Sequence, residues 1–133
     1  MLIRGDSHER SSGRVKRCSR CGNSEFGCRY VAAMTAGDRA ALESLFFENA
    51  CEVGHYQGEL LWNTRDAFIG MCEEAKTDDL NPAWTIRNLS VHGDIAVVHV
   101  QNDWAGLPFD DILTLLHHEG AWRVVSKVYR VRP

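Results

Sequence analysis

Three titratable side chains lie where the sequence pattern predicts β-strands, and their chemistry suits proton transfer. His55 falls inside a short predicted strand, Asp103 ends a later strand, and Asp111 begins the strand after that. Histidine titrates near pH 6.5, at about neutral pH, and an apolar pocket raises the pKa of a carboxyl group. These residues are therefore candidate catalytic acids and bases. The alternatives are a hydrogen-bonded histidine without a catalytic role and a solvated hairpin end that carries the aspartates.

The aromatic side chains are numerous for a small domain, and ligand pockets are mostly aromatic and apolar with a few polar groups. We expect at least one aromatic residue to face a cavity, although each of them could equally pack in an ordinary core. Within the predicted strands, a threonine hydroxyl could bind a ligand, and a lysine could pair with an acidic ligand or with Asp111, or lie exposed or in an interface. The candidate ligand-binding residues are Phe46, Trp62, Trp84, Trp104, Thr114, Lys127 and Tyr129.

The motif that most resembles a metal site is Cys18-Ser19-Arg20-Cys21 near the N-terminus. A structural zinc site needs four ligands, and no second ligand pair with suitable spacing follows this motif. The sequence also contains no glycine-rich phosphate loop, serine nucleophile elbow or His-Glu-x-x-His helix. We therefore expect neither a bound metal nor another cofactor.

The chain of 133 residues has the length of a single domain. Residues 1–22 contain six basic and two acidic residues, although the whole chain has a net charge of −3. We expect a flexible basic tail over residues 1–22 and an acidic folded domain over residues 23–133. An acidic domain argues against nucleic acid as a partner. The sequence has no apolar run of signal-peptide or membrane-spanning length, so we expect no membrane association and a cytoplasmic location.

Hydrophobic periodicity predicts helices in the first half of the chain and a long meander at its end. Asp38 and Thr64 are candidate N-caps. The predicted helices cover residues 24–37, 39–47 and 65–75, and the predicted strands cover residues 50–57, 60–62, 83–92, 95–104, 109–118 and 121–132. The last three strands exceed the usual length of about 5–6 residues. This order of elements predicts an α+β fold with a mostly antiparallel sheet.

The strand over residues 95–104 is apolar on both faces. Val98 and Val100 point to one side, and Ile95 and Val97 point to the other. Helices can cover one face, and a second subunit is the simplest cover for the other. The sequence therefore predicts a homodimer that forms through the sheet.

An ordered set of motifs over residues 25–131 resembles the NTF2-like (SnoaL-like, cystatin-like α+β) superfamily, closest to its branch named "putative lumazine-binding". Among the shared positions, Asp103 and Asp111 match the family pattern, whereas Asp110 does not. The motifs are Tyr-Val-x-Ala-x-x-Ala-Gly-Asp-x-x-Ala-Leu-x-x-Leu-Phe (30–46), Gly-x-x-x-Gly-Glu-Leu (54–60), Gly-Asp-x-Ala-Val-Val (93–98), Asp-Trp-x-Gly-x-x-Phe-x-Asp-x-Leu-Thr-Leu-Leu (103–116) and Gly-x-Trp-x-Val-Val-x-Lys-Val-Tyr (120–129).

The resemblance implies a cone in which a curved sheet wraps three helices, with a pocket whose mouth lies near His55, Trp62 and Trp104. It also implies a homodimer, but it implies little chemistry because the superfamily contains both enzymes and binding modules. Two functions follow. One is a non-catalytic domain that binds a small, partly aromatic molecule. The other is a cofactor-free isomerase, dehydratase or epoxide hydrolase with His55 and Asp103 or Asp111 as acid and base.

Overall fold

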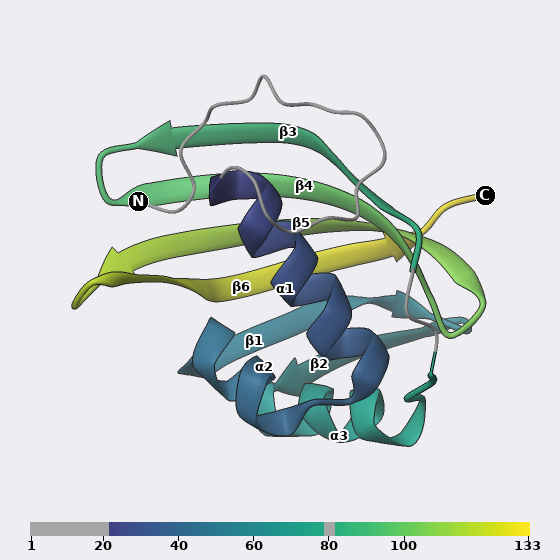
Figure 1. The fold of residues 1–133 in the computed structure, drawn as a ribbon. Coiled ribbons are helices and arrows are strands. Elements are labelled where there is room, and N and C mark those ends of the chain that lie inside the picture. Colours follow the sequence, from purple (N-terminus) through teal and green to yellow (C-terminus); the bar gives the residue numbers. More distant parts are fainter. Residues whose placement is uncertain (1–21, 79–81) are drawn as a thin grey trace.

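The computed structural model describes residues 22–78 and 82–133. The Cys18–Cys21 motif and nearly all of the predicted tail therefore lie outside the described residues. The described residues form three helices and six strands, arranged as in Figure 1, and the predicted α+β class is confirmed. Their bounds are α1 (Gly22–Ala36), α2 (Arg39–Leu45), β1 (Phe46–Tyr56), β2 (Glu59–Thr64), α3 (Arg65–Glu74), β3 (Trp84–His92), β4 (Ile95–Trp104), β5 (Leu107–His118) and β6 (Ala121–Val131).

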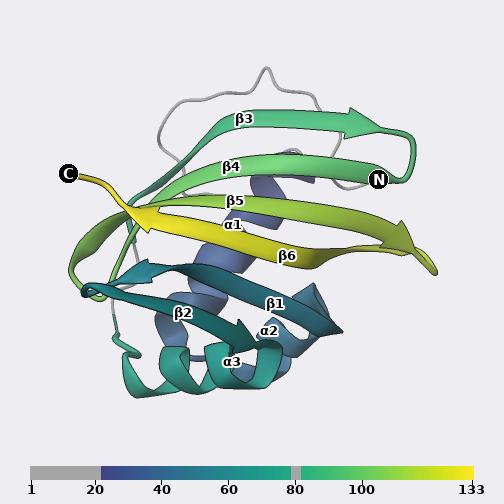
Figure 2. The same ribbon diagram turned by 180° about the vertical axis from the view of Figure 1, so that it is seen from behind.

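The six strands form one curved sheet in the order β2-β1-β6-β5-β4-β3. Neighbouring strands are antiparallel except β1 and β6, which are parallel. The helices lie against the concave side of this sheet, and α1 crosses it diagonally (Figure 1). Figure 2 shows the opposite, convex side, which none of the described helices covers. The core therefore lies between the concave side of the sheet and the three helices.

The two predicted helix caps are confirmed. The Asp38 carboxylate accepts a hydrogen bond from the backbone N–H of Ala41, and the Thr64 hydroxyl accepts one from the N–H of Ala67. Each bond satisfies an N–H group that the first helical turn leaves without a partner. The predicted end of the second helix is wrong, because β1 already begins at Phe46, which has extended dihedral angles (φ −120°, ψ 138°) and pairs with β6.

The long C-terminal meander is also confirmed. Strands β4, β5 and β6 contain 10, 12 and 11 residues. The hairpin between β4 and β5 turns at Ala105 and Gly106, which both have positive φ angles, as a tight two-residue turn requires. Strands of this length extend from the part of the sheet that the helices cover to the open end of the cone. Residues at the ends of these strands can therefore line a pocket.

A bulge in β6 determines which of its side chains enter the cone. Thr114 pairs with Ser126, but the next residue of β5 pairs with Val124, so Val125 is an extra residue. Side chains alternate between the two faces of a strand, and an extra residue reverses this alternation. Trp122 and Val124 are buried before the bulge, and Lys127 and Tyr129 are buried after it. Without the bulge, Lys127 would lie on the convex face.

Gly54 allows β1 to approach Tyr129 of β6. A Cβ atom at this position would collide with the Tyr129 carbonyl oxygen and lie 2.8 Å from two atoms of its ring. We expect Gly54→Ala to lower the free energy of unfolding by about 1–3 kcal/mol, the usual cost of overpacking. Urea denaturation measures this change.

Gly70→Ala is the matched control, because a Cβ atom added at this position in α3 would meet only open space. Alanine favours a helix by about 0.8–1.0 kcal/mol over glycine, so the control variant should be no less stable than the original protein. Equal losses of stability in the two variants would contradict the close approach at Gly54.

Candidate functional site

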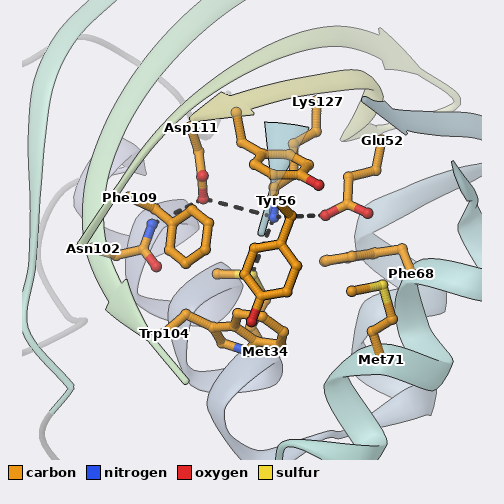
Figure 3. A pocket seen from close by; sticks show the side chains of 11 residues that line it. Met34, Glu52, Tyr56, Phe68, Met71, Asn102, Trp104, Phe109, Asp111 and Lys127 are labelled. Atoms are coloured by element: carbon orange, nitrogen blue, oxygen red, sulfur yellow. Dashed lines mark hydrogen bonds and ion pairs between the residues drawn. The ribbon is translucent and has the colours of Figure 1, made fainter. Parts of the chain in front are cut away.

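A narrow pocket lies inside the cone, and it holds charged, amide and aromatic side chains close together (Figure 3). Its volume is about 20 Å³, which is room for little more than one water molecule. Residues from α1, α3 and four strands line it: Met34, Glu52, Tyr56, Phe68, Met71, Asn102, Trp104, Phe109, Asp111, Lys127 and Tyr129.

Lys127 lies at the centre of the pocket between two buried carboxylates. Its Nζ atom is 3.6 Å from Oε2 of Glu52 and 3.7 Å from Oδ2 of Asp111. All three side chains are at least nine-tenths buried. They come from the adjacent strands β1, β6 and β5, and Glu52 is the direct register partner of Lys127. The sheet therefore places one ammonium group and two carboxylates side by side within an apolar interior.

Hydrogen bonds from neighbouring side chains hold both carboxylates in place. The Tyr30 hydroxyl donates to Oδ2 of Asp111 over 2.7 Å, and the Asn102 amide donates to the same atom over 2.9 Å. On the other side of the pocket, the Asn63 amide donates to Oε1 of Glu52 over 2.9 Å. Buried charges are stable in a protein only when they are paired and hydrogen-bonded, and these bonds meet that need.

Aromatic rings and a methionine sulfur surround the ammonium group. Nζ of Lys127 lies 4.3 Å from the centre of the Phe68 ring and 3.6 Å from the sulfur of Met34. Burial alone would lower the pKa of Lys127, but Asp111 and Glu52 outweigh it and raise the pKa above its ordinary value. The side chain therefore remains a positively charged ammonium group at neutral pH.

Two tyrosine hydroxyls near the centre also keep their protons. Burial, reinforced by the charge of Asp111, raises the pKa of Tyr30 well above its ordinary value. Burial, with a further contribution from Glu52, raises the pKa of Tyr129 to about 12. Tyr30 is consequently a hydrogen-bond donor to Asp111 at neutral pH.

Three buried polar atoms of the pocket residues have no hydrogen-bond partner among the described residues. They are Oδ1 of Asn102, Oδ1 of Asp111 and Nε1 of Trp104. Leaving a buried donor or acceptor unsatisfied costs about 1–3 kcal/mol. The pocket therefore offers two acceptors and one donor that a bound molecule could satisfy.

The rings of Tyr56, Trp104 and Phe109 lie together at one end of the pocket, which we call its mouth. The Tyr56 ring lies 6.5 Å from that of Trp104 and 6.1 Å from that of Phe109, between ring centres. Trp104 and Phe109 are 5.9 Å apart in an edge-to-face arrangement. Tyr56 ends β1 and Trp104 ends β4, and both residues directly precede a hairpin turn. The two half-buried side chains meet because the sheet curves, although two strands separate β1 from β4.

Four residues that the sequence analysis selected line the pocket: Trp104, Asp111, Lys127 and Tyr129. Three others lie outside its lining, and all three are exposed. His55 and its register partner Leu60 lie on the convex face of β1 and β2, while Glu52 and Gly54 are buried on the concave face. The three exposed residues are His55, Trp62 and Asp103.

Of the remaining selected residues, two pack in or against the core and one lies on the convex face of the sheet. The Phe46 ring is buried in the core, 5.3 Å from that of Phe68 between ring centres. Trp84 is half-buried and packs against the core, where Gly27 of α1 leaves room for its ring. Thr114 alternates with the buried residues of β5, and its hydroxyl forms a 2.8 Å hydrogen bond with that of Ser126.

Sequence reasoning missed five polar or aromatic residues of the pocket lining, namely Glu52, Tyr56, Phe68, Asn102 and Phe109. It also missed Tyr30, which donates a hydrogen bond to Asp111. Asn102 carried a usable signal, because it continues the inward row of Ala96, Val98 and Val100 in β4. An amide in such an apolar row needs a buried partner. Glu52 carried a similar signal, since it lies between Ala50 and Gly54 on the inward side of β1. The contribution of Tyr56 depends on sheet curvature, for which the sequence contains no local signal.

Two features important for function are not found in the described part of the chain. Across residues 22–78 and 82–133, no cluster of three or more His, Cys, Asp or Glu side chains could hold a metal ion. No helix in the same ranges is both long enough and apolar enough to cross a membrane.

The curved sheet and the three helices on its concave side define an NTF2-like α+β domain. Solved structures share this fold. An NTF2-like protein of unknown function from Silicibacter pomeroyi DSS-3 is 62% identical, with a TM-score of 0.80 over 82% of this chain and 92% of that chain. A similar protein of unknown function from Shewanella baltica OS155 is 22% identical, with a TM-score of 0.73 over 82% and 90% of the two chains.

A ketosteroid isomerase-like protein from Erwinia carotovora atroseptica SCRI1043 shares the fold at 13% identity, with a TM-score of 0.62 over 82% of this chain and 92% of that chain. No curated protein sequence matches the chain. The family model described as "Putative lumazine-binding" matches residues 24–130. The chain belongs to this family, and the resemblance inferred from the sequence motifs is confirmed.

Lys127 should be essential for stability because it neutralises two buried carboxylates. We expect Lys127→Met to lower the free energy of unfolding by about 3–5 kcal/mol, the usual cost of removing one partner from a buried ion pair. Adding Glu52→Gln should recover part of this loss, since it removes one of the unpaired charges. Chemical denaturation of both single variants and of the double variant measures this coupling.

Lys76→Met provides the control, because Lys76 is exposed. A surface substitution of this kind usually changes stability by less than about 0.5 kcal/mol. If Lys127→Met were as mild as the control, the ion-pair arrangement at the centre of the pocket would be refuted.

Proposed function

We propose that this protein is a non-catalytic domain that binds a small, flat, partly aromatic molecule in the pocket around Lys127. The observation that carries the proposal is the combination of aromatic walls with unsatisfied buried polar atoms at one site. Ligand pockets are typically apolar with a few polar groups that orient the ligand. The name of the family points to lumazine, a flat bicyclic heterocycle, as the first molecule to test.

The electrostatics of the pocket favour binding over acid–base catalysis. General acid–base catalysis works best when the catalytic pKa lies near the operating pH. Tyr30 and Lys127 have pKa values that move upward, away from neutrality. His55 and Asp103, two of the three acid–base candidates, are exposed and outside the pocket lining.

Binding requires the pocket to open, since its present volume of about 20 Å³ is too small for a bicyclic molecule. Tyr56 and Trp104 are the side chains placed to move, because each is half-buried and directly precedes a hairpin turn. Exposed side chains and loop ends reorient faster than residues packed within a core. In this proposal the incoming ligand takes the place between these rings and stacks on them.

Calorimetric titration with lumazine tests the proposal. We expect saturable binding to the unmodified protein, and we expect Trp104→Ala to weaken it roughly threefold to tenfold, because an aromatic contact contributes about 0.5–1.5 kcal/mol. Trp62→Ala is the matched control, since Trp62 is 72% exposed and does not line the pocket.

Equal weakening by the two tryptophan substitutions would contradict binding in this pocket. Failure of lumazine and of other flat bicyclic heterocycles to bind would contradict the proposed function as a whole. Turnover of such a molecule would favour the alternative, a cofactor-free acid–base enzyme.

We also propose that two copies of the chain associate through the convex face of the sheet. Seven large apolar side chains on this face are exposed, which is typical of an interaction surface. They extend across β2, β4, β5 and β6 and comprise Leu60, Trp62, Ile95, Val97, Ile112, Val125 and Val128. Polar contacts lie among them: Asp110 binds His99 over 2.8 Å and Arg130 over 2.9 Å.

A charge in the middle of the convex face tests this assembly. Val128 and Ile112 are register partners there, and Val128 is 53% exposed. Val128→Asp should convert a dimer into a monomer at micromolar concentration, as measured by light scattering, because it would bury a charge without a partner. Val91→Asp, at an exposed valine near the end of β3, should leave the dimer intact. A monomeric unmodified protein would refute the proposal.

A further inference from the structure

The unpaired atoms of the pocket carry information about the chemical class of its ligand. Asn102 and Asp111 are each 2% exposed, and each has one side-chain oxygen without a hydrogen-bond partner among the described residues. The other oxygen of Asp111 already accepts bonds from Tyr30 and Asn102. Both unpaired atoms are acceptors, and the two side chains that carry them lie on the same side of the pocket, opposite Glu52 (Figure 3). A ligand satisfies them only by donating hydrogen bonds.

The formal charge of the pocket leads to the same conclusion. Two carboxylates, Glu52 and Asp111, face a single ammonium group, so the site has an excess of negative charge. The ammonium group of Lys127 is also engaged, since it lies between the two carboxylates and over the Phe68 ring. An anionic ligand would meet net repulsion in an interior with little water to screen it.

The aromatic walls favour a flat ligand and tolerate a positive charge on it. The ring faces of tyrosine, tryptophan and phenylalanine attract cations. Tyr56, Trp104 and Phe109 form such a wall next to the two unpaired oxygens. Nε1 of Trp104 is an unpaired donor that can bind a ring nitrogen or a carbonyl oxygen of the ligand.

Resting on the proposed binding function, we infer that the ligand is a flat, nitrogen-rich heteroaromatic molecule with N–H donors along one edge, neutral or positively charged. Its donor edge faces Asn102 and Asp111, and its rings stack among Tyr56, Trp104 and Phe109. Flat molecules with a carboxylate or a phosphate are excluded by the charge of Asp111 and Glu52. The selectivity follows from unpaired acceptors, because a site built to receive donors rejects an analogue that lacks them.

Three bicyclic probes of similar size test separately the need for N–H donors and the effect of a negative charge on the ligand. 2-Aminobenzimidazole carries adjacent N–H donors, 2-methylbenzoxazole has the same shape without donors, and benzoxazole-2-carboxylate adds a negative charge. Calorimetry or NMR titration should show 2-aminobenzimidazole binding at least tenfold more tightly than 2-methylbenzoxazole. The carboxylate should bind most weakly of the three.

Two substitutions test whether the expected order of probe affinities depends on the unpaired oxygens of Asp111 and Asn102. Asp111→Asn should weaken 2-aminobenzimidazole at least tenfold while leaving 2-methylbenzoxazole within about twofold. Asp110→Asn is the control, because its side chain lies on the convex face, where it binds His99 and Arg130. Asn102→Leu removes the second acceptor and provides an independent test if Asp111→Asn does not fold, which thermal unfolding will show.

The outcomes distinguish the ligand class from the binding function itself. If the carboxylate or 2-methylbenzoxazole binds as tightly as 2-aminobenzimidazole, the inferred ligand class is wrong and the proposed binding function stands. Equal effects of Asp110→Asn and Asp111→Asn would likewise overturn the inferred class. If neither lumazine nor any of the three probes binds, both the class and the binding function are wrong.

Discussion

The buried pairing of Lys127 with Glu52 and Asp111 is the interaction on which the interior of this protein depends. Each of these charges would be costly to bury alone, and the three are tolerable only because the ammonium group lies within 3.7 Å of both carboxylates. The arrangement requires β1, β6 and β5 to be neighbours in that order. The charges thereby disfavour any other register of the three central strands, since a shift of one residue would leave them unpaired.

The same pairing explains why the pocket is polar at its centre and aromatic at its mouth. Tyr30, Asn63 and Asn102 surround the carboxylates because buried oxygen lone pairs need donors. Towards the open end of the cone, the rings of Tyr56 and Phe109 pack against each other and fill the space. A molecule that entered the pocket would first replace the contacts between the aromatic rings at its mouth. It would then reach the hydrogen-bonding groups deeper inside.

The sheet separates two kinds of surface by the alternation of its strands. Side chains of β5 illustrate this, because Asp111 enters the pocket while its neighbours Asp110 and Ile112 face the convex side. The helices cover only the concave side, so the apolar residues of the convex side remain available to a partner (Figure 2). The ligand binding and the self-association that we propose would therefore use opposite faces of the same strands, and we expect a substitution on one face to affect only one of them.

Local sequence signals determined the order of the elements, the caps at Asp38 and Thr64 and the long C-terminal meander. These features depend on nearby residues, and short-range patterns encode them reliably. The motifs were likewise sufficient to identify the family. No single motif was specific to the family, but the complete set in its order along the chain was.

Only the tertiary structure decided which side chains share the pocket. The bulge at Val125 turns Lys127 and Tyr129 inward, and strict alternation from Trp122 would have placed them on the convex face. Sheet curvature brings Tyr56 to Trp104 across two intervening strands, whereas His55 of the same β1 strand faces outward. A one-residue bulge reverses which face of the sheet the following side chains point to, and a gradual bend brings together residues of strands that are not neighbours. Neither feature has a local sequence signal.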